Sequence, residues 1–254
     1  MELNYKKLGN GQALLILHGL FGSLDNWMSH AKTLSEDFEV WLIDQRNHGQ
    51  SPHDSEFDYP SMSNDLLGFI QQHEIKNPIL LGHSMGGKTV MEFSVNYPQM
   101  VDKLIVVDIA PVKYPVHHYT IIEALESIDF DFVTSRKEAD DNLSKYINNV
   151  GIRQFLLKNL YWIEKEKLAW RFNLDVIKNE IIPISEFSIS DGKYEGNTLF
   201  INGSNSEYIL PSYAMQIAEK FPNYDLVEIA EAGHWVHAEA PKLFLEAIQT
   251  FMKD

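Results

Sequence analysis

The sequence contains no cysteine in its 254 residues. This absence excludes disulfide bonds, thiolate metal sites and a cysteine nucleophile together. Basic residues are also scarce, because 21 lysines and arginines stand against 36 aspartates and glutamates, which gives a net charge of −15. A protein this acidic repels phosphate backbones and anionic lipid, so we expect neither a nucleic acid nor a membrane surface as its partner.

Long apolar runs are absent as well. No run approaches the roughly 20 residues that span a bilayer, and residues 1–7 are too charged for an export signal, so we expect a cytoplasmic protein. Hydrophobic residues make up 44% of the chain and charged residues 22%, a balance typical of packed globular proteins. At roughly 150 residues per domain, the length predicts one large domain, or one domain with an insertion.

Short apolar runs recur along the chain and are mostly continuous, as expected of strands that are covered on both faces. They lie at residues 13–17, 40–43, 79–81, 104–107, 199–201 and 226–229. Helical patterns separate them, and the clearest is the last, which places Phe244, Ile248 and Phe251 on one stripe. This alternation predicts an α/β fold with a mostly parallel, doubly wound sheet between helices.

The stretch from residue 111 to residue 196 breaks the alternation. It contains helical patterns, such as the one at residues 155–161, and many aromatic residues, but no convincing buried strand. We interpret it as a helical cap inserted between the fourth and fifth of the six apolar runs. The chain then consists of a core at residues 1–110 and 197–254 and a cap at residues 111–196. The alternative is a set of ordinary outer helices whose aromatic side chains only fill a core.

Residues 82–86 read Gly-His-Ser-Met-Gly, directly after one strand run and directly before a helical pattern. In this context the G-x-S-x-G pattern holds its serine on a sharp strand-to-helix turn, at the carboxyl edge of the sheet. The flanking positions need glycine because the helix and the neighbouring strand approach closely. The pattern predicts Ser84 as a nucleophile; the alternative is an ordinary serine in a glycine-rich turn.

A serine hydroxyl needs a base within hydrogen-bond reach. Of the ten histidines, we favour His234, because it follows the last strand run and precedes the last helix, and so emerges at the same sheet edge as Ser84. His237 could pair with His234 at a metal, but no third ligand at suitable spacing is evident. We expect packing, solvated or pocket-lining roles for three other histidines: His83, His117 and His118.

The base in turn needs an acid that fixes its tautomer. Asp108 directly follows the run at residues 104–107, and Glu207 lies in the loop after the next run. In that loop many enzymes of this architecture carry an aspartate three residues after the glycine, where this sequence has Ser206. We therefore favour Asp108 and keep Glu207 as the alternative; the chain order serine, acid, histidine holds for both.

Acyl transfer also needs backbone N–H donors for the oxyanion that forms at the carbonyl. One donor is normally the residue after the nucleophile, here Met85. The other comes from the loop after an early strand, where residues 18–22 read His-Gly-Leu-Phe-Gly. We expect Leu20 to supply it, with Phe21 as the alternative.

Taken together, the stretches at residues 17–19, 44–51, 82–88, 107–111 and 233–237 resemble the α/β-hydrolase superfamily. Within it they are most similar to the small bacterial esterases of the YbfF type and their mitochondrial relatives. The resemblance implies a carboxylesterase or acyl-thioesterase with the triad Ser84, Asp108 and His234. We expect the helical cap to lie between the sixth and seventh strands of the sheet. The resemblance also identifies Asp44 and Arg46 with the common D-x-R-x-x-G-x-S turn, which organises a loop.

The expected chemistry is two-step hydrolysis of a small-molecule ester or thioester through an acyl-enzyme, without a cofactor or a metal. A histidine base must be neutral to accept a proton, so activity should rise from about pH 6 to about pH 8. We expect the cap to form an apolar wall that favours short to medium acyl chains. The residues expected to bind substrate are Phe21, Tyr119, Trp162 and Trp235.

Other activities stay open on this scaffold, because a fold does not fix a function. They are cofactor-free perhydrolysis, carbon–carbon bond hydrolysis and synthase-type elimination, and, from another class, non-catalytic binding. Dehalogenases and epoxide hydrolases of similar architecture use an aspartate nucleophile, and Ser84 argues against them. The sequence does not determine the oligomeric state.

Overall fold

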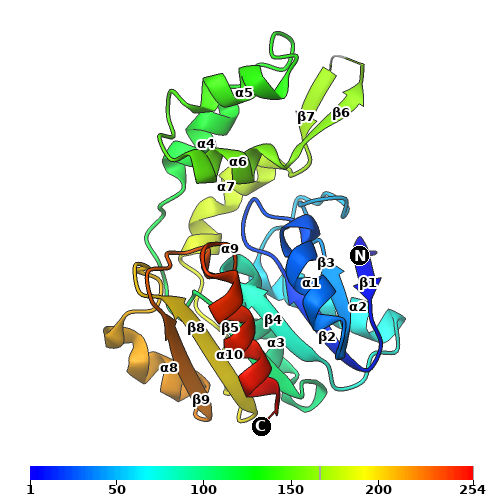
Figure 1. Ribbon diagram of the computed structural model, residues 1–254, viewed down its shortest axis with the longest axis vertical. Coiled ribbons are helices and arrows are strands. Elements are labelled where there is room, and N and C mark those ends of the chain that lie inside the picture. Colours follow the sequence, from blue (N-terminus) through cyan, green and yellow to red (C-terminus); the bar gives the residue numbers. More distant parts are fainter. Residues whose placement is uncertain (166, 254) are drawn as a thin grey trace.

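The computed structural model describes residues 1–165 and 167–253 (Figure 1). Its central sheet has seven strands in the order β1-β3-β2-β4-β5-β8-β9, and only β1 runs antiparallel to its neighbour. The strands are β1 (Tyr5–Leu8), β2 (Gln12–Leu17), β3 (Phe38–Ile43), β4 (Ile79–His83), β5 (Lys103–Val107), β8 (Asn197–Gly203) and β9 (Tyr224–Ile229). All six predicted runs are strands, which confirms the α/β fold and its mostly parallel sheet.

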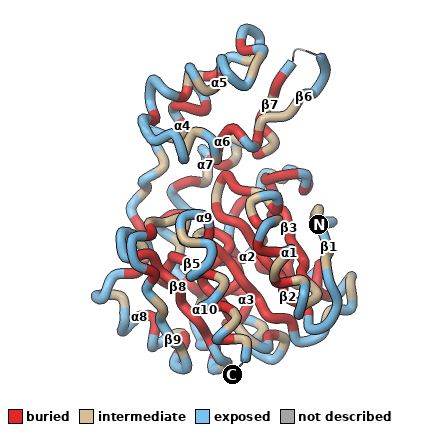
Figure 2. The backbone as a smooth tube through the Cα atoms, in the orientation of Figure 1, coloured by how far each residue is buried: buried red, intermediate tan, exposed pale blue. Residues whose placement is uncertain are grey.

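Side chains of the strands enter separate apolar clusters on the two faces of the sheet. In β2, for example, Leu15 and Leu17 pack with one cluster, whereas Leu14 and Ile16 pack with the other. Helices α2 (Tyr59–Gln72) and α3 (Met85–Asn96) cover the first face, and α1 (Met28–Leu34) and α10 (Pro241–Lys253) cover the second. Figure 2 shows the central strands as buried. Burial on both faces explains why these strands read as continuous apolar runs.

The remaining core helices are short. They are α8 (Ala214–Lys220), α9 (Val236–Glu239), and the 3₁₀ turns η1 (Leu24–Trp27), η2 (Pro98–Met100) and η3 (Pro211–Tyr213). Strand β1 was not expected, because its four residues lie on the sheet edge with three of them exposed, so they carry no apolar pattern.

The described residues of the segment between β5 and β8 form four helices and a hairpin, gathered at one end of the sheet (Figure 1). The elements are α4 (Tyr119–Glu126), α5 (Arg136–Leu143), α6 (Val150–Leu157), α7 (Leu174–Ser185), β6 (Leu160–Glu164) and β7 (Lys167–Trp170). They share a third apolar cluster, which also takes in Phe21 and Met85 from the core. The segment therefore packs directly over the strand-to-helix turn that carries Ser84.

Two expectations about this segment are wrong. It is not purely helical, because β6 and β7 pair as an antiparallel hairpin; the apolar pattern at residues 155–161 spans the end of α6 and the start of β6. The segment also lies between the fifth and sixth strands of the seven-stranded sheet in chain order, not between the sixth and seventh. The segment follows the fourth of the six predicted runs, and the unexpected strand β1 adds one more strand before it.

Among the described residues, no helix has both the length and the apolar character needed to cross a membrane.

Candidate active site

Ser84 stands at the turn between β4 and α3, with backbone angles φ 52° and ψ −115°. A positive φ is strained for a residue other than glycine, and such strain concentrates at functional sites. The turn is tight enough that a Cβ on Gly82 would lie 2.2 Å from the carbonyl oxygen of Gly86, and a Cβ on Gly86 would lie 2.5 Å from that of Leu17. Both contacts are with backbone that cannot move aside, so both flanking positions require glycine.

Gly86→Ala is accordingly expected to lower the free energy of unfolding by about 3 kcal/mol, because the added methyl group must displace β2 or α3. Urea denaturation measures this. The matched control is Gly68→Ala on the exposed face of α2, where no atom lies within 4 Å of the new Cβ. That change should raise stability by about 1 kcal/mol through helix propensity. Equal effects of the two substitutions would contradict the packing argument.

His234 lies in the loop between β9 and α9, and its ring reaches both other members of the predicted triad. Nε2 is 3.1 Å from Oγ of Ser84, and Nδ1 is 2.7 Å from Oδ2 of Asp108. His83 holds the loop in place, because its Nε2 donates a hydrogen bond of 2.9 Å to the carbonyl oxygen of His234. The ring of Tyr208 stacks on the His234 ring with 4.1 Å between centroids. The imidazole is thus fixed between the hydroxyl and the carboxylate.

Asp108 follows β5 directly and is fully buried. Besides His234, its carboxylate accepts hydrogen bonds from the backbone N–H of Gly203 at 3.1 Å and from Oγ of Ser206 at 2.5 Å. Its own φ is +53°, a second strained position at the site. Glu207, the alternative acid, lies exposed beside this group. The geometry favours Asp108.

Ser206 is a site residue whose role the sequence did not indicate. An aspartate is common at this position in enzymes of this architecture. The contact of the Ser206 hydroxyl with Oδ2 of Asp108 arises only because the strands β5 and β8 are neighbours in the sheet. An aspartate at position 206 would place a second carboxylate beside Asp108, whereas the serine hydroxyl donates a hydrogen bond to it. This fits an acid that enters the site from β5 rather than from β8.

The loop after β2 provides one free candidate for the second oxyanion donor. The N–H of Phe21 donates to Nε2 of His48 at 3.1 Å, so it is already engaged. Of the two candidates, Leu20 is left, and it borders the same cavities as Ser84. Gly19 lies against Ser84, since a Cβ there would be 3.3 Å from the serine Cβ.

Asp44 and Arg46 organise the neighbouring loop, as the resemblance implied. Asp44 accepts hydrogen bonds from the backbone N–H groups of Leu24 and Gln50 at 2.8 and 2.9 Å. Arg46 makes two hydrogen bonds to the carboxylate of Asp65, at 2.6 and 3.0 Å. Neither side chain lines a cavity that contains Ser84.

Two small cavities, each of about 40 Å³, meet at Ser84, Leu20 and His118. We call them the Lys88 cavity and the Trp235 cavity. The first is also bordered by Tyr59, Met85, Lys88, Tyr114, His117 and Tyr208. The second is also bordered by Gly19, Phe21, Phe155, Leu156, His234 and Trp235. The Trp235 cavity adjoins a larger hollow of about 450 Å³, which shares Phe155 and Trp235 with it.

The aromatic residues predicted to bind substrate divide into two pairs. Phe21 and Trp235 border the Trp235 cavity. Tyr119 and Trp162 border neither cavity, and their side chains are 52% and 54% exposed. The structure does not bring this second pair to the site, because Tyr119 begins α4 with its ring outward and Trp162 lies on the exposed strand β6.

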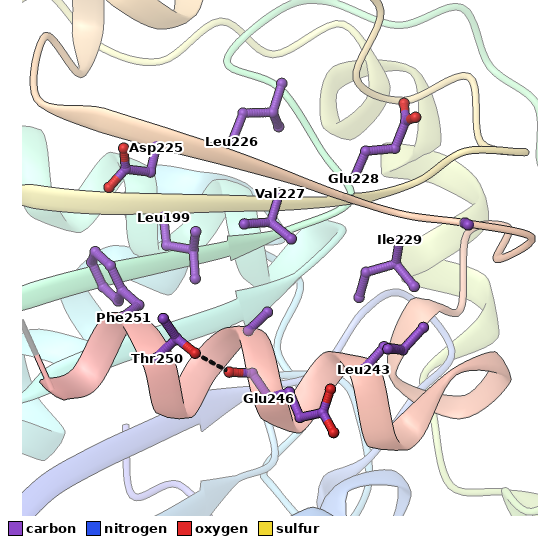
Figure 3. A pocket seen from close by; sticks show the side chains of 12 residues that line it. Leu199, Asp225, Leu226, Val227, Glu228, Ile229, Leu243, Glu246, Thr250 and Phe251 are labelled. Atoms are coloured by element: carbon purple, nitrogen blue, oxygen red, sulfur yellow. Dashed lines mark hydrogen bonds between the residues drawn. The ribbon is translucent and has the colours of Figure 1, made fainter.

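A hollow of about 640 Å³, larger than either cavity at Ser84, lies elsewhere, between β9 and α10 (Figure 3). It is lined by aliphatic residues of both elements together with Asp225, Glu228 and Glu246, and Ser84 is not among its residues. Size alone therefore does not locate the chemistry of this protein.

Burial keeps the neighbouring histidines neutral. It lowers the pKa of His83 well below its ordinary range, that of His118 to about 4 and that of His237 to about 3. His237 stacks on Trp27 with 4.3 Å between ring centroids, a packing role rather than a partnership with His234 at a metal. No group of three His, Asp or Glu side chains suited to a metal ion occurs within residues 1–165 and 167–253.

The fold and the hydrogen-bonded serine, histidine and aspartate together define a class of protein, the serine hydrolases built on an α/β sheet. A model of the alpha/beta hydrolase fold matches residues 12–140, and the chain belongs to that family.

Similar proteins narrow the class. The mouse sn-1-specific diacylglycerol lipase ABHD11 is 39% identical over 248 residues, which cover 94% of this chain and 80% of the relative. Esterase YbfF of Escherichia coli is 37% identical over 246 residues, covering 96% and 94%. A solved marine microorganism esterase superposes with a TM-score of 0.95 at 45% identity, covering 98% and 99%. These matches confirm the resemblance to YbfF-type esterases, and the chain is an esterase/lipase-type hydrolase of the α/β fold.

Proposed function

We propose that the protein hydrolyses carboxylic esters and acyl thioesters of short to medium acyl chains, with Ser84 as nucleophile, His234 as general base and acid, and Asp108 as its acid partner. The observation that carries the proposal is the continuous hydrogen-bond chain from Ser84 through His234 to Asp108, at the junction of two small cavities. The core at residues 1–110 and 197–254 supplies the chemistry, and residues 111–196 act as the cap. The cytoplasmic location stays a prediction.

The reaction proceeds in two steps. Oγ of Ser84 attacks the acyl carbon while Nε2 of His234 takes its proton. The backbone N–H groups of Leu20 and Met85 stabilise the oxyanion of the tetrahedral intermediate. When that intermediate collapses, Nε2 gives the proton to the leaving alcohol or thiol, and an acyl-enzyme remains. Water, deprotonated by the same nitrogen, then attacks the acyl carbon, releases the acid and restores the Ser84 hydroxyl.

The two cavities fit the two halves of an ester. The leaving group must receive its proton from His234, and of the two cavities only the Trp235 cavity is bordered by His234. We therefore assign the leaving group to the Trp235 cavity, with the 450 Å³ hollow beyond it available for a larger alcohol or thiol. The Lys88 cavity, bordered by Ser84 and Met85, takes the acyl group.

A matrix of substrates tests this assignment, with acyl chains of two to twelve carbons combined with small and large leaving groups on both oxygen and sulfur. We expect kcat/KM to fall at least tenfold between hexanoyl and dodecanoyl esters, because a cavity of about 40 Å³ holds few carbon atoms. Enlarging the leaving group should have little effect. A preference for the longest acyl chains would reverse the assignment of the cavities, and no hydrolysis of any member would overturn the proposed function.

A further inference from the structure

Lys88 is a buried cation that the hydrolytic mechanism does not use. Its side chain is 2% exposed, and it lies on α3 four residues after Ser84, on the same face of the helix. One hydrogen of Nζ goes to the carbonyl oxygen of Phe187 at 2.9 Å. Nζ also lies 5.1 Å from the ring centre of Tyr114 and 5.7 Å from that of Tyr59. An ammonium has three donors, so this environment leaves it under-satisfied.

The charge of Lys88 has no carboxylate partner in the part of the chain that the structure describes. Within residues 1–165 and 167–253, no Asp or Glu oxygen lies within ion-pair distance of Nζ. Glu92, one turn further along α3, is engaged elsewhere, with Ser190 and Asn96. Buried lysines are normally paired, because an isolated ammonium loses its hydration. Here that loss lowers the pKa of Lys88 to about 7.

Lys88 borders the cavity that we assign to the acyl group, together with Ser84. We propose that Lys88 recognises a carboxylate at the far end of the acyl group, so that half-esters of short dicarboxylic acids are favoured substrates. This rests on the proposed function, since it specifies the acyl group of the same reaction. A carboxylate would give the ammonium the partner that the described residues do not supply, through a charge-assisted hydrogen bond.

The rings around Nζ are suited to such a ligand. Burial raises the pKa of Tyr59, Tyr114 and Tyr208 above the ordinary tyrosine range, so all three hydroxyls stay neutral and none competes as an anion. His118 is neutral, since burial lowers its pKa to about 4, and His117 lies at the exposed end of the cavity. Lys88 is thus the single basic side chain that is fully buried in the wall of this cavity.

Three ethyl esters of similar shape test the proposal. They share the ethanol leaving group and differ only in the group at the far end of the acyl chain. Monoethyl succinate carries a carboxylate, ethyl 4-oxopentanoate replaces it with a neutral ketone, and ethyl 4-methylpentanoate replaces it with an isopropyl group. We expect kcat/KM for the succinate to exceed that of each neutral ester by roughly tenfold to a hundredfold. The ratio should be full below about pH 6 and lost by about pH 8, as Lys88, whose pKa is about 7, gives up its proton.

Two variants separate recognition from structural support. Lys88→Met removes both the charge and the hydrogen bond to Phe187, whereas Lys88→Gln keeps a donor for that carbonyl and removes only the charge. Both should abolish the preference for succinate over the two neutral esters and the pH dependence of that preference. Lys113→Met removes one lysine charge at an exposed position. It therefore controls for the change in the protein's net charge and should leave the preference for succinate intact.

The outcomes are distinct. If Lys88→Gln lowered kcat/KM equally for all three esters, Lys88 would be a structural residue. If the wild-type protein hydrolysed the succinate and the ketone ester at equal rates, Lys88 would recognise a neutral acceptor. Either result would overturn the proposal that Lys88 recognises a carboxylate. If the wild-type protein hydrolysed none of the three esters, the proposed function itself would fail, independently of Lys88.

Discussion

Ser84→Ala is expected to lower kcat for a short-chain ester by about 10⁶-fold, with little change in the free energy of unfolding. The substitution removes the atom that forms the acyl-enzyme, and His234 is left 3.1 Å from an empty position. A rate about 10³-fold above the uncatalysed rate should remain, because the proposed oxyanion donors, the backbone N–H groups of Leu20 and Met85, are unchanged. Steady-state kinetics on homogeneous protein measures the loss. Labelling by a fluorophosphonate should disappear with it.

A second serine at the same site provides the control for this experiment. Oγ of Ser206 also lies within hydrogen-bond distance of the triad, but it donates to Asp108, and Ser206 borders neither of the two cavities at Ser84. Ser206→Ala should therefore cost about tenfold in kcat and leave fluorophosphonate labelling at one site per chain. If Ser84→Ala retained more than a hundredth of the wild-type activity, or still became labelled, another residue would be the nucleophile.

Much of the fold was predictable, because local patterns determine it. Strands buried on both faces must be apolar at every position, so the six runs were visible without a structure. Strand β1 escaped for the opposite reason, since three of its four residues are exposed and carry no such pattern. In the hairpin, the apolar residues 160–163 of β6 are not buried, and only two of the four residues of β7 are buried, so neither strand has the pattern of a central strand. In the segment between β5 and β8, apolar residues at residues 155–161 belong to two elements, and spacing alone does not show where one ends.

The site residues divide in the same way, into those that a local sequence pattern indicates and those that depend on how distant segments pack. Ser84, Asp108 and His234 could be found because each follows a parallel strand, and parallel strands end at a common edge. Other features of the site depend on contacts between segments far apart in the chain. They are the contact of Ser206 with Asp108, the hydrogen bond from the N–H of Phe21 to His48, and that from Lys88 to Phe187. Tyr119 and Trp162 show the converse. Their residue type suits a substrate wall, but the direction of their side chains depends on how the helices and hairpin pack.

Asp108→Asn is expected to lower kcat by about 10⁴-fold while the protein stays folded. The cause is the set of donors around the carboxylate. If the amide nitrogen takes the place of Oδ2, it faces Nδ1 of His234 and forces the proton to Nε2, where the base must be free to accept from Ser84. If the amide turns over, its nitrogen instead faces the N–H of Gly203, so neither orientation satisfies all partners.

Glu207→Gln is the matched control, since it makes the same change from carboxylate to amide at the alternative acid, the residue that follows Ser206. Its side chain is exposed, so we expect kcat to change less than twofold. Kinetics on one ester, circular dichroism and the rate of fluorophosphonate labelling compare the two variants. A labelling rate that falls with kcat in Asp108→Asn alone identifies a base in the wrong tautomer. Large losses in Glu207→Gln with small ones in Asp108→Asn would instead transfer the role of the acid to Glu207.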